Sequence, residues 1–295
     1  MIAGTRAAAL PAELEGRVEQ FRMPELRSPA AIDSALQGID AIVHLAARVH
    51  VMRDTAEDPL AQYRRVNTDA TLRLARSAAR HGVARFVFMS TVKVNGERTT
   101  ARPFSDQDEP NPVDPYAVSK WEAERGLAGI ASETALKVTT FRPPLVYGSG
   151  VKGNFLRLLR LARMRLPLPL AGVKNSRSMI YVGNLVSAIE RVLSVEASAG
   201  GTFLVSDDAD LSTPQLVEML GAAMGRPARL FSVPSGLLVA LGRALGKGDE
   251  MMRMIESLRV DCSGLKRQLQ WAPPFTLEQG IKETADWYLR TSSAS

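Results

Sequence analysis

A tyrosine and a lysine stand four residues apart in the segment Tyr116-Ala-Val-Ser-Lys120. Asp114 is a good helix N-cap and Pro115 suits the first helical position, so we expect Tyr116 and Lys120 on one face of a helix. A phenol titrates at about pH 10, but a nearby ammonium and the positive end of a helix favour the phenolate. The pair could therefore exchange a proton with a substrate hydroxyl or ketone. Taken alone, this spacing is common by chance and favours an unrelated pair on an exposed helical face.

A serine and a threonine stand at the end of the predicted buried strand Arg85–Ser90: Ser90 is its last residue and Thr91 follows it. Strand ends in doubly wound sheets are where ligands bind. The Thr91 hydroxyl could hydrogen-bond the same substrate oxygen as Tyr116. Turn chemistry is the plainer explanation of a Ser-Thr pair at this place.

Two small residues, Ala46 and Ala47, follow another predicted buried strand, Asp40–Leu45. Side chains of this size would let a ligand approach the backbone at the strand end. Close packing of a helix against the strand is the alternative explanation.

Apolar strands that alternate with helices must position these residues. The predicted helices are Ser28–Gln37, Asp58–His81 and Asp114–Ala131, and the further strands are Val18–Arg22 and Lys137–Phe141. Continuous apolar strands separated by helices predict an α/β fold, a doubly wound Rossmann-type parallel sheet covered on both faces. After about residue 148 the pattern becomes mostly helical. We therefore expect a dinucleotide-binding domain over residues 1–148 and a smaller substrate lobe over 149–295, with some strands returning to the main sheet.

In this order, the segments resemble the extended short-chain dehydrogenase/reductase superfamily, specifically its NAD-dependent epimerases and dehydratases of nucleotide sugars, which are UDP-glucose 4-epimerase-like. The resemblance covers the chain from about residue 1 to about residue 290. It implies that Tyr116, Lys120 and Thr91 are catalytic. It also implies that the nicotinamide cofactor is bound by Ala46, Ala47, Asn67, Ser90, Tyr116, Lys120 and Pro143.

The resemblance places a substrate site in the second lobe. Besides Thr91, it implies that Asn154 contacts the sugar diphosphate and that Arg177 binds the phosphates, with Arg259 a weaker candidate for the same task. Arginine suits phosphate because its planar guanidinium gives bidentate, charge-assisted hydrogen bonds. The implied substrate is a UDP-sugar.

The reaction class depends on the residues after Thr91. Val92 and Lys93 stand where 4,6-dehydratases of this family carry an Asp-Glu pair, so a dehydratase of that type is not expected. A 4-epimerase or a 4-ketoreductase remains, acting at C4 of a UDP-hexose in surface-polysaccharide sugar synthesis. The chain looks most like bacterial reductases of UDP-4-keto-6-deoxy-N-acetylhexosamines. The alternative is a catalytically impaired protein that binds a sugar nucleotide or serves as a dimer partner. The family's dimer bundle implies a homodimer through the helices at 58–81 and 114–131.

The family's glycine-rich phosphate loop, G-x-x-G-x-x-G, does not occur in the sequence. Met1–Arg6 looks like the end of a second strand, so a first strand, its loop and its helix are expected to be missing. Either the start codon is mis-assigned or the chain is truncated, or the protein has lost dinucleotide binding. Because the first strand is central in this fold, its loss would leave unpaired sheet edges. Arg6 lies near the place where an acidic residue selects NAD and an arginine accommodates the phosphate of NADP. Its presence slightly favours NADP, but both NAD and NADP stay open as the cofactor.

Composition excludes several other classes. The single cysteine, Cys262, cannot form an intrachain disulfide, which favours a reducing, cytoplasmic location. The three histidines have no metal-ligand spacing, so no metal site is expected. No apolar run is long enough to span a bilayer, and no signal peptide is evident.

The net charge of +6 and pI of about 9.7 first suggest a nucleic-acid partner. However, seven basic residues and no acidic residue lie between 152 and 177, with only Phe155 as an aromatic, so no nucleic-acid site is expected. We rank binding of a sugar diphosphate first, a solvated basic face second and membrane contact third. The apolar stripe of this segment, Phe155, Leu158, Leu159 and Ala162, is expected to be core.

Overall fold

The computed structural model describes residues 2–5, 19–22, 29–49, 58–164, 166–195, 200–244, 246 and 248–293. The chain divides into two compact units. Unit 1 comprises Met1–Ser90, Val113–Thr140 and Ala199–Gly201, and unit 2 comprises Thr91–Pro112, Phe141–Ser198 and Thr202–Ser295. The chain thus passes between the units several times, and the domain division at residue 148 stays a prediction.

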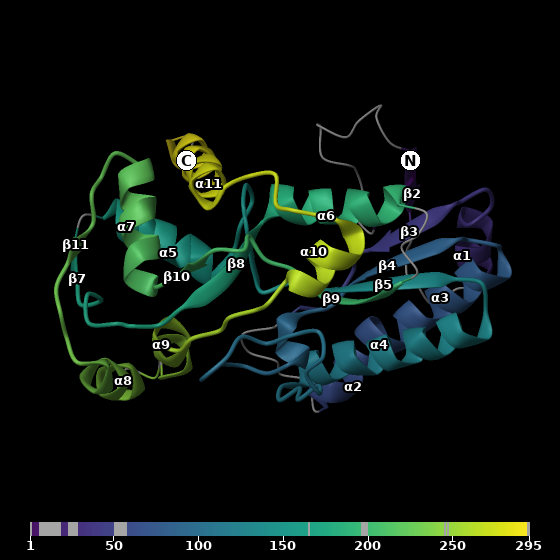
Figure 1. Cartoon of the computed structure of the whole chain (residues 1–295), viewed down its shortest axis with the longest axis horizontal. Helices are drawn as coiled ribbons and strands as arrows, with labels where there is room; N and C mark the ends of the chain where they lie inside the picture. Colours follow the sequence, from purple (N-terminus) through teal and green to yellow (C-terminus); the bar gives the residue numbers. More distant parts are fainter. Residues whose placement is uncertain are drawn as a thin grey trace. The chain divides into compact units, whose positions relative to one another are not determined.

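The main sheet of unit 1 is parallel where β3 (Ala41–His44) pairs with β4 (Arg85–Met89). The strand order of this sheet is β3-β4-β5-β9 (Figure 1). The first residues of β5 (Lys137–Arg142) and β9 (Gly201–Leu204) belong to unit 1. The interior strand β4 buries Phe86, Val87 and Phe88 completely. Burial of a continuous apolar strand is what a parallel sheet covered on both faces requires, so the predicted α/β fold is confirmed.

Two short strands, β1 (Ile2–Thr5) and β2 (Glu19–Arg22), form a separate parallel pair in unit 1. Among the described residues, β3 is an edge strand of the main sheet, as expected from the sequence. Val43 in this strand and Leu45 just after it are 37% and 61% exposed. Apolar side chains at an unpaired edge are normally covered, so this edge is unusual.

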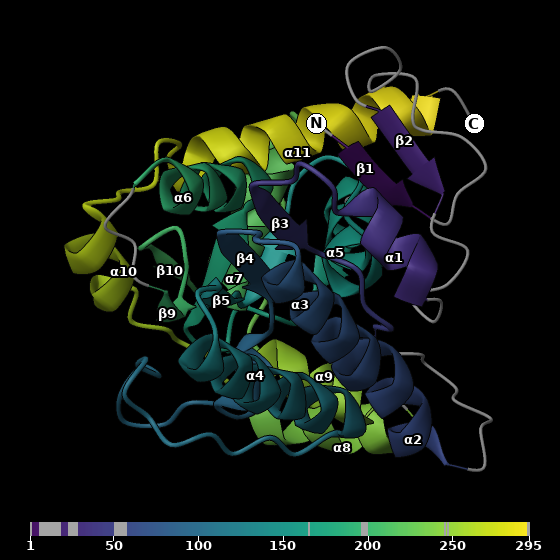
Figure 2. The same ribbon diagram turned by 90° about the vertical axis from the view of Figure 1, so that its right-hand side faces the viewer.

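Helices cover the sheet of unit 1. They are α1 (Pro29–Ala35), α2 (Pro59–Tyr63), a π-helix (Arg64–Asp69), α3 (Ala70–Arg80) and α4 (Pro115–Glu133). The segment predicted as one helix over 58–81 is α2, the π-helix and α3 in succession, and it ends at Gly82, whose φ is +72°. A side chain at Gly126 of α4 would come within 2.6 Å of Leu72, so this glycine lets α3 and α4 lie close together (Figure 2).

The sheets of unit 2 are small. Strand β8 (Arg177–Tyr181) lies between β6 (Leu145–Tyr147) and β10 (Asp210–Leu211), and β7 (Pro167–Leu168) pairs in parallel with β11 (Arg229–Leu230). The helices are α5 (Gly153–Arg163), α6 (Val182–Ser194), α7 (Thr213–Ala223), α8 (Ser235–Ala244), α9 (Gly248–Ile255), α10 (Ser263–Leu269) and α11 (Leu277–Ser293).

The core of unit 2 includes the apolar stripe of α5. Phe155, Leu159 and Ala162 are buried within it and Leu158 packs against it. The stripe is therefore core, as the sequence predicts, and does not face a membrane. Among the described residues, no helix combines the length and apolar character needed to cross a bilayer.

Candidate active site

Lys120 lies on α4 and points to the carboxyl end of β4. Its side chain is 2% exposed, and its Nζ donates a hydrogen bond to the Met89 carbonyl at 2.7 Å. The ammonium also lies 4.4 Å from the centre of the Phe88 ring. A charged group held in this way, at the end of a parallel strand, has the place that ligand-binding residues take in such sheets.

Burial lowers the pKa of Lys120 to about 8, and the charge of Glu124 opposes this shift. Glu124 is itself buried and accepts a hydrogen bond from the Ser90 hydroxyl. It follows Lys120 by one helical turn, so the same spacing rule that pairs Tyr116 with Lys120 could have found it. Ser90, Lys120 and Glu124 therefore form one buried polar cluster.

Tyr116 opens the same helix, because Asp114 caps α4 as predicted and accepts the Ala117 N–H at 2.7 Å. Its ring packs edge-on against Tyr63, with the ring centres 6.1 Å apart. Burial, followed by the charge of Asp114 and the neighbouring Tyr63, raises the pKa of Tyr116 to about 12. The lowered pKa expected from the sequence is not found, because desolvation of the phenol is the largest effect on it.

Asn67 fixes the loop that follows β3. The side chain is fully buried in the π-helix, where its Oδ1 accepts the Arg48 N–H at 2.8 Å and its Nδ2 donates to the Arg48 carbonyl at 3.0 Å. Ala46 is exposed and Ala47 half-buried in this loop. Asn67, which the family resemblance places among the cofactor-binding residues, therefore supports this turn from the π-helix.

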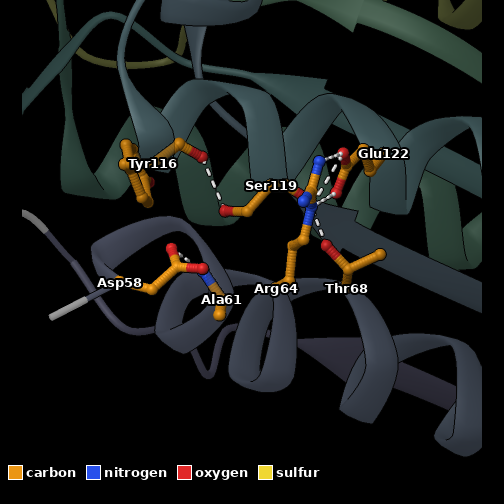
Figure 3. A network of polar contacts seen from close by, with 7 residues as sticks. All are labelled: Asp58, Ala61, Arg64, Thr68, Tyr116, Ser119 and Glu122. Atoms are coloured by element: carbon orange, nitrogen blue, oxygen red, sulfur yellow. Dashed lines mark hydrogen bonds and ion pairs between the residues drawn. The ribbon is translucent and has the colours of Figure 1, made fainter.

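A chain of hydrogen bonds joins the π-helix to the opening turn of α4. Asn67 Nδ2 donates to the Ser119 hydroxyl at 3.0 Å, and that hydroxyl donates to the Tyr116 carbonyl at 2.7 Å. Thr68 Oγ1 donates to the Ser119 carbonyl at 2.8 Å, and Arg64 forms an ion pair with Glu122 (Figure 3). Tyr116 and the loop at Ala46 are thus tied through Ser119 and Asn67.

Unit 2 contains a cavity of about 410 Å³ that α5, β8, α7 and α9 enclose with neighbouring residues. Two of the predicted substrate residues, Asn154 and Arg177, line this cavity together. Other polar or charged lining residues are Arg157, Arg160, Ser212, Thr213 and Arg253, and the apolar ones are Leu145, Leu158, Leu161, Met179, Leu211, Leu216 and Met254. Four arginines among the lining residues of one cavity suit an anion such as a diphosphate.

Arg177 is anchored at the end of α9. Its Nη1 donates to the carbonyls of Arg253 and Glu256, at 2.9 and 3.0 Å. These carbonyls lie at the negative end of the helix, which favours a cation there. Burial lowers the pKa of Arg177 from its ordinary value, but an arginine stays charged at neutral pH.

Arg253 lines the cavity and Arg259 does not. The Arg259 guanidinium instead donates to the Ala101 carbonyl at 3.0 Å. Arg253 is thus a stronger candidate than Arg259 for the second phosphate-binding arginine. Arg253 stands in no recognised motif, and the sequence does not show that α9 brings it next to Arg177.

The remaining predicted site residues are less informative. Thr91 is buried in unit 2, where its Oγ1 accepts the Lys93 N–H at 3.3 Å, and the next residue, Val92, donates its N–H to the Pro143 carbonyl at 3.0 Å. The roles of Thr91 beside Tyr116 and of Pro143 beside the nicotinamide stay predictions. Arg6 lies outside the described residues. Within the described part of the chain, no group of three or more His, Cys, Asp or Glu residues could hold a metal ion.

The residues of unit 1 fit the nicotinamide and ribose half of a dinucleotide. The fit is seen in the buried Lys120 ammonium at the end of β4 and in the small residues Ala46 and Ala47, whose loop Asn67 locks. If a dinucleotide binds here, Lys120, Tyr116, Ser90 and the alanine loop are the residues that would hold it. For the pyrophosphate half, the sequence offers no glycine-rich turn of the usual type.

The parallel sheet, the buried Lys120 at the carboxyl end of β4 and the arginine-lined cavity are features of a dinucleotide-dependent enzyme of the Rossmann-like class. Residues 3–205 match the family described as "NAD dependent epimerase/dehydratase family". A UDP-glucose 4-epimerase from Vibrio cholerae is 39% identical over 275 residues, which cover 92% of this chain and 84% of that protein. The chain therefore belongs to the NAD dependent epimerase/dehydratase family, and it is an enzyme of this NAD-dependent type.

Two further proteins show the range of the similarity. An N-acetyl-alpha-D-glucosaminyl-diphospho-ditrans,octacis-undecaprenol 4-epimerase from Escherichia coli O157:H7 is 29% identical over 292 residues, or 91% of this chain and 83% of that protein. The crystal structure of a UDP-glucuronic acid 4-epimerase from Bacillus cereus in complex with NAD has a TM-score of 0.76 at 21% identity, covering 95% of this chain and 83% of that one. At this identity the structural match shows the fold alone, and that fold is the predicted one.

Proposed function

We propose that this protein is an NAD-dependent 4-epimerase that inverts C4 of a UDP-hexose. The observation that carries the proposal is the Tyr116–Lys120 pair on α4, with the Lys120 ammonium buried at the carboxyl end of β4. The 39% identical relative from Vibrio cholerae is a UDP-glucose 4-epimerase, which supports the reaction class and the sugar carrier. The 4-ketoreductase left open by the sequence becomes an outcome of the test below.

In this mechanism Tyr116 moves the proton of the C4 hydroxyl. The phenolate accepts that proton as C4 is oxidised, and the phenol returns it to the C4 oxygen after the 4-keto sugar has turned over. Bound NAD supplies the acceptor and donor of the C4 hydride. The Lys120 ammonium is charged below about pH 8, and we propose that it favours the phenolate against the burial that raises the pKa of Tyr116 to about 12. Thr91 is proposed to hydrogen-bond the same oxygen.

The arginine cavity is proposed to bind the diphosphate of the substrate. Arg177 is preset by two carbonyls at the end of α9, so little side-chain freedom is lost when an anion binds. Arg253 and Asn154 line the same cavity. Binding energy gained at the diphosphate, which does not react, can be used to orient the sugar.

We also propose that the protein is a homodimer through the helices at 58–81 and 114–131. The support is that α2, the π-helix, α3 and α4 form one continuous layer in unit 1, with exposed residues along α4 (Figure 2). Light scattering coupled to size-exclusion chromatography measures the mass directly. A monomeric mass at micromolar concentration would contradict this part of the proposal.

The test is incubation of the purified protein with NAD and either UDP-glucose or UDP-N-acetylglucosamine, followed by chromatographic separation of the C4 epimers. Formation of the epimer without net change in NADH absorbance is expected. Net oxidation of NADH with a UDP-4-keto sugar and no epimerisation would identify a ketoreductase instead. If the protein binds the UDP-sugar but catalyses neither reaction, it is the catalytically impaired sugar-nucleotide-binding protein, and the proposal is overturned.

A further inference from the structure

Unit 2 exposes large apolar side chains on one stretch of its surface, which we call the β11–α8 face. Its members are Leu166, Phe231, Leu237 and Leu241, which are 53%, 48%, 61% and 54% exposed. On α8, Leu237 and Leu241 lie one turn apart and point outwards, whereas Leu238 is buried in the core. Apolar residues gathered on an exposed face mark interaction surfaces more often than single exposed residues do.

Backbone pairing brings the members of this face together from two parts of the chain. Leu166 precedes β7, which pairs in parallel with β11, and Phe231 follows β11. The Phe231 N–H donates to the Leu168 carbonyl at 3.0 Å, and the chain then turns into α8, which begins at Ser235 (Figure 1). Residues of these elements, Leu168, Leu230 and Leu238, share one core cluster, so the exposed members lie on one packed part of unit 2.

The sequence segments that carry this face are basic. The sequence from 219 to 248 contains Arg226, Arg229, Arg243 and Lys247 and no acidic residue, and the segment around Leu166 lies within another acid-free stretch, 134–189. The Arg226 guanidinium donates to the Arg163 carbonyl at 3.2 Å, so the two basic stretches meet. Exposed apolar side chains on segments rich in arginine complement a surface that is apolar below and anionic above.

We propose that the β11–α8 face docks on an anionic lipid bilayer, with α8 lying in the plane of the interface. Leucine and phenylalanine side chains would enter the boundary between headgroups and acyl chains, while the arginines would contact anionic headgroups. A protein partner, including a second copy of this chain, would need acidic groups to match the cations. This face itself contributes none from residues 219–248, so it does not complement a copy of itself.

The position of the face gives the docking a consequence. Helix α8 packs against α9, and α9 supplies Arg253 and Met254 to the cavity (Figure 2). Docking through α8 would therefore bring the arginine cavity close to the plane of the headgroups. An enzyme held there could meet sugar diphosphates made or used at the membrane surface.

The test is cosedimentation of the full-length protein with vesicles of phosphatidylcholine alone or of phosphatidylcholine mixed with phosphatidylglycerol. We expect binding to the mixed vesicles that falls with added salt, because the cationic contribution is screened. The double variant Leu237→Glu with Leu241→Glu should bind the mixed vesicles with an affinity that is lower by about tenfold or more. Val186→Glu, at an exposed position on α6, is the matched control and should bind like the parent.

Circular dichroism and the mass in solution show whether each variant is folded and in the parent's oligomeric state. Equal vesicle binding by the double variant and the Val186→Glu control would overturn the proposal, and so would no preference for phosphatidylglycerol. If the parent binds no vesicles and the double variant has half the parent's mass in solution, the face is instead a contact with a second copy of the chain. Vesicle binding is measured without turnover, so its outcome is independent of the proposed epimerase activity.

Discussion

The two candidate sites, one in each unit, use charge in opposite ways. In unit 1 a single ammonium, Lys120, is buried and held by the Met89 carbonyl, with Glu124 one turn away. In unit 2 several guanidinium groups surround a cavity of about 410 Å³, and two of them, Arg157 and Arg160, are exposed. Burial shifts the pKa of the Lys120 and Tyr116 side chains, whereas a guanidinium is in general not deprotonated in proteins.

This contrast indicates a division of labour. A proton-transfer group needs a pKa that its surroundings can tune, and burial is the strongest means of tuning it. An anion-binding site needs permanent charge and geometry that fits phosphate, which arginine provides at any pH. We therefore expect substitutions in unit 1 to change kcat and its pH dependence, and substitutions in unit 2 to change KM.

The largest expected effect is that of Tyr116→Phe. Without the hydroxyl, the C4 proton has no carrier, and kcat should fall by about 10²- to 10⁴-fold, with KM changed little. Steady-state kinetics with the UDP-hexose measures both constants. The thermal unfolding midpoint should stay near that of the parent, because the ring and its contact with Tyr63 remain. Turnover close to the parent's would remove Tyr116 from the mechanism.

The next effect in size is that of Arg253→Met in the cavity. Loss of one guanidinium should raise KM about 10- to 100-fold, the range for a charged hydrogen bond to phosphate, and leave kcat within a fewfold of the parent. Arg259→Met should raise KM much less, because Arg259 does not line the cavity. An equal rise in KM for the two variants would argue against the cavity as the diphosphate site. Lys282→Met, an exposed position on α11, controls for the loss of one positive charge.

The sequence predicted the parts of unit 1 that depend on local rules. The cap at Asp114, the shared face of Tyr116 and Lys120, and the strand at Arg85–Met89 follow from spacing and residue type, and the structure contains all of them. The raised pKa of Tyr116 could not be predicted, because it depends on how deeply Tyr63 and the neighbouring elements bury the phenol. Burial is a property of the tertiary packing.

Unit 2 was less predictable for a related reason. Its cavity gathers residues from α5, β8, α7 and α9, which are far apart in the sequence. Asn154 and Arg177 were found because they stand in motifs that resemble those of a known family. Arg253 stands in no such motif, and only the packing of α9 against the end of β8 brings it to Arg177. The exposure of Leu237 and Leu241 on α8 also depends on packing, and the sequence predicted only that this part of the chain is mostly helical.

The smallest effect tests how Lys120 is tuned. Burial lowers its pKa to about 8 and the charge of Glu124 raises it, so Glu124→Gln should lower that pKa further. As the pH rises through the pKa, Lys120 loses the charge that favours the phenolate, and activity falls. The alkaline limb of the kcat–pH profile should therefore move to lower pH, by about one unit or less. Glu122→Gln, on the same helix but paired with Arg64, should leave the limb in place. If both variants shift it equally, general electrostatics of α4 sets the profile, and the buried cluster of Ser90, Lys120 and Glu124 has no special role in proton transfer.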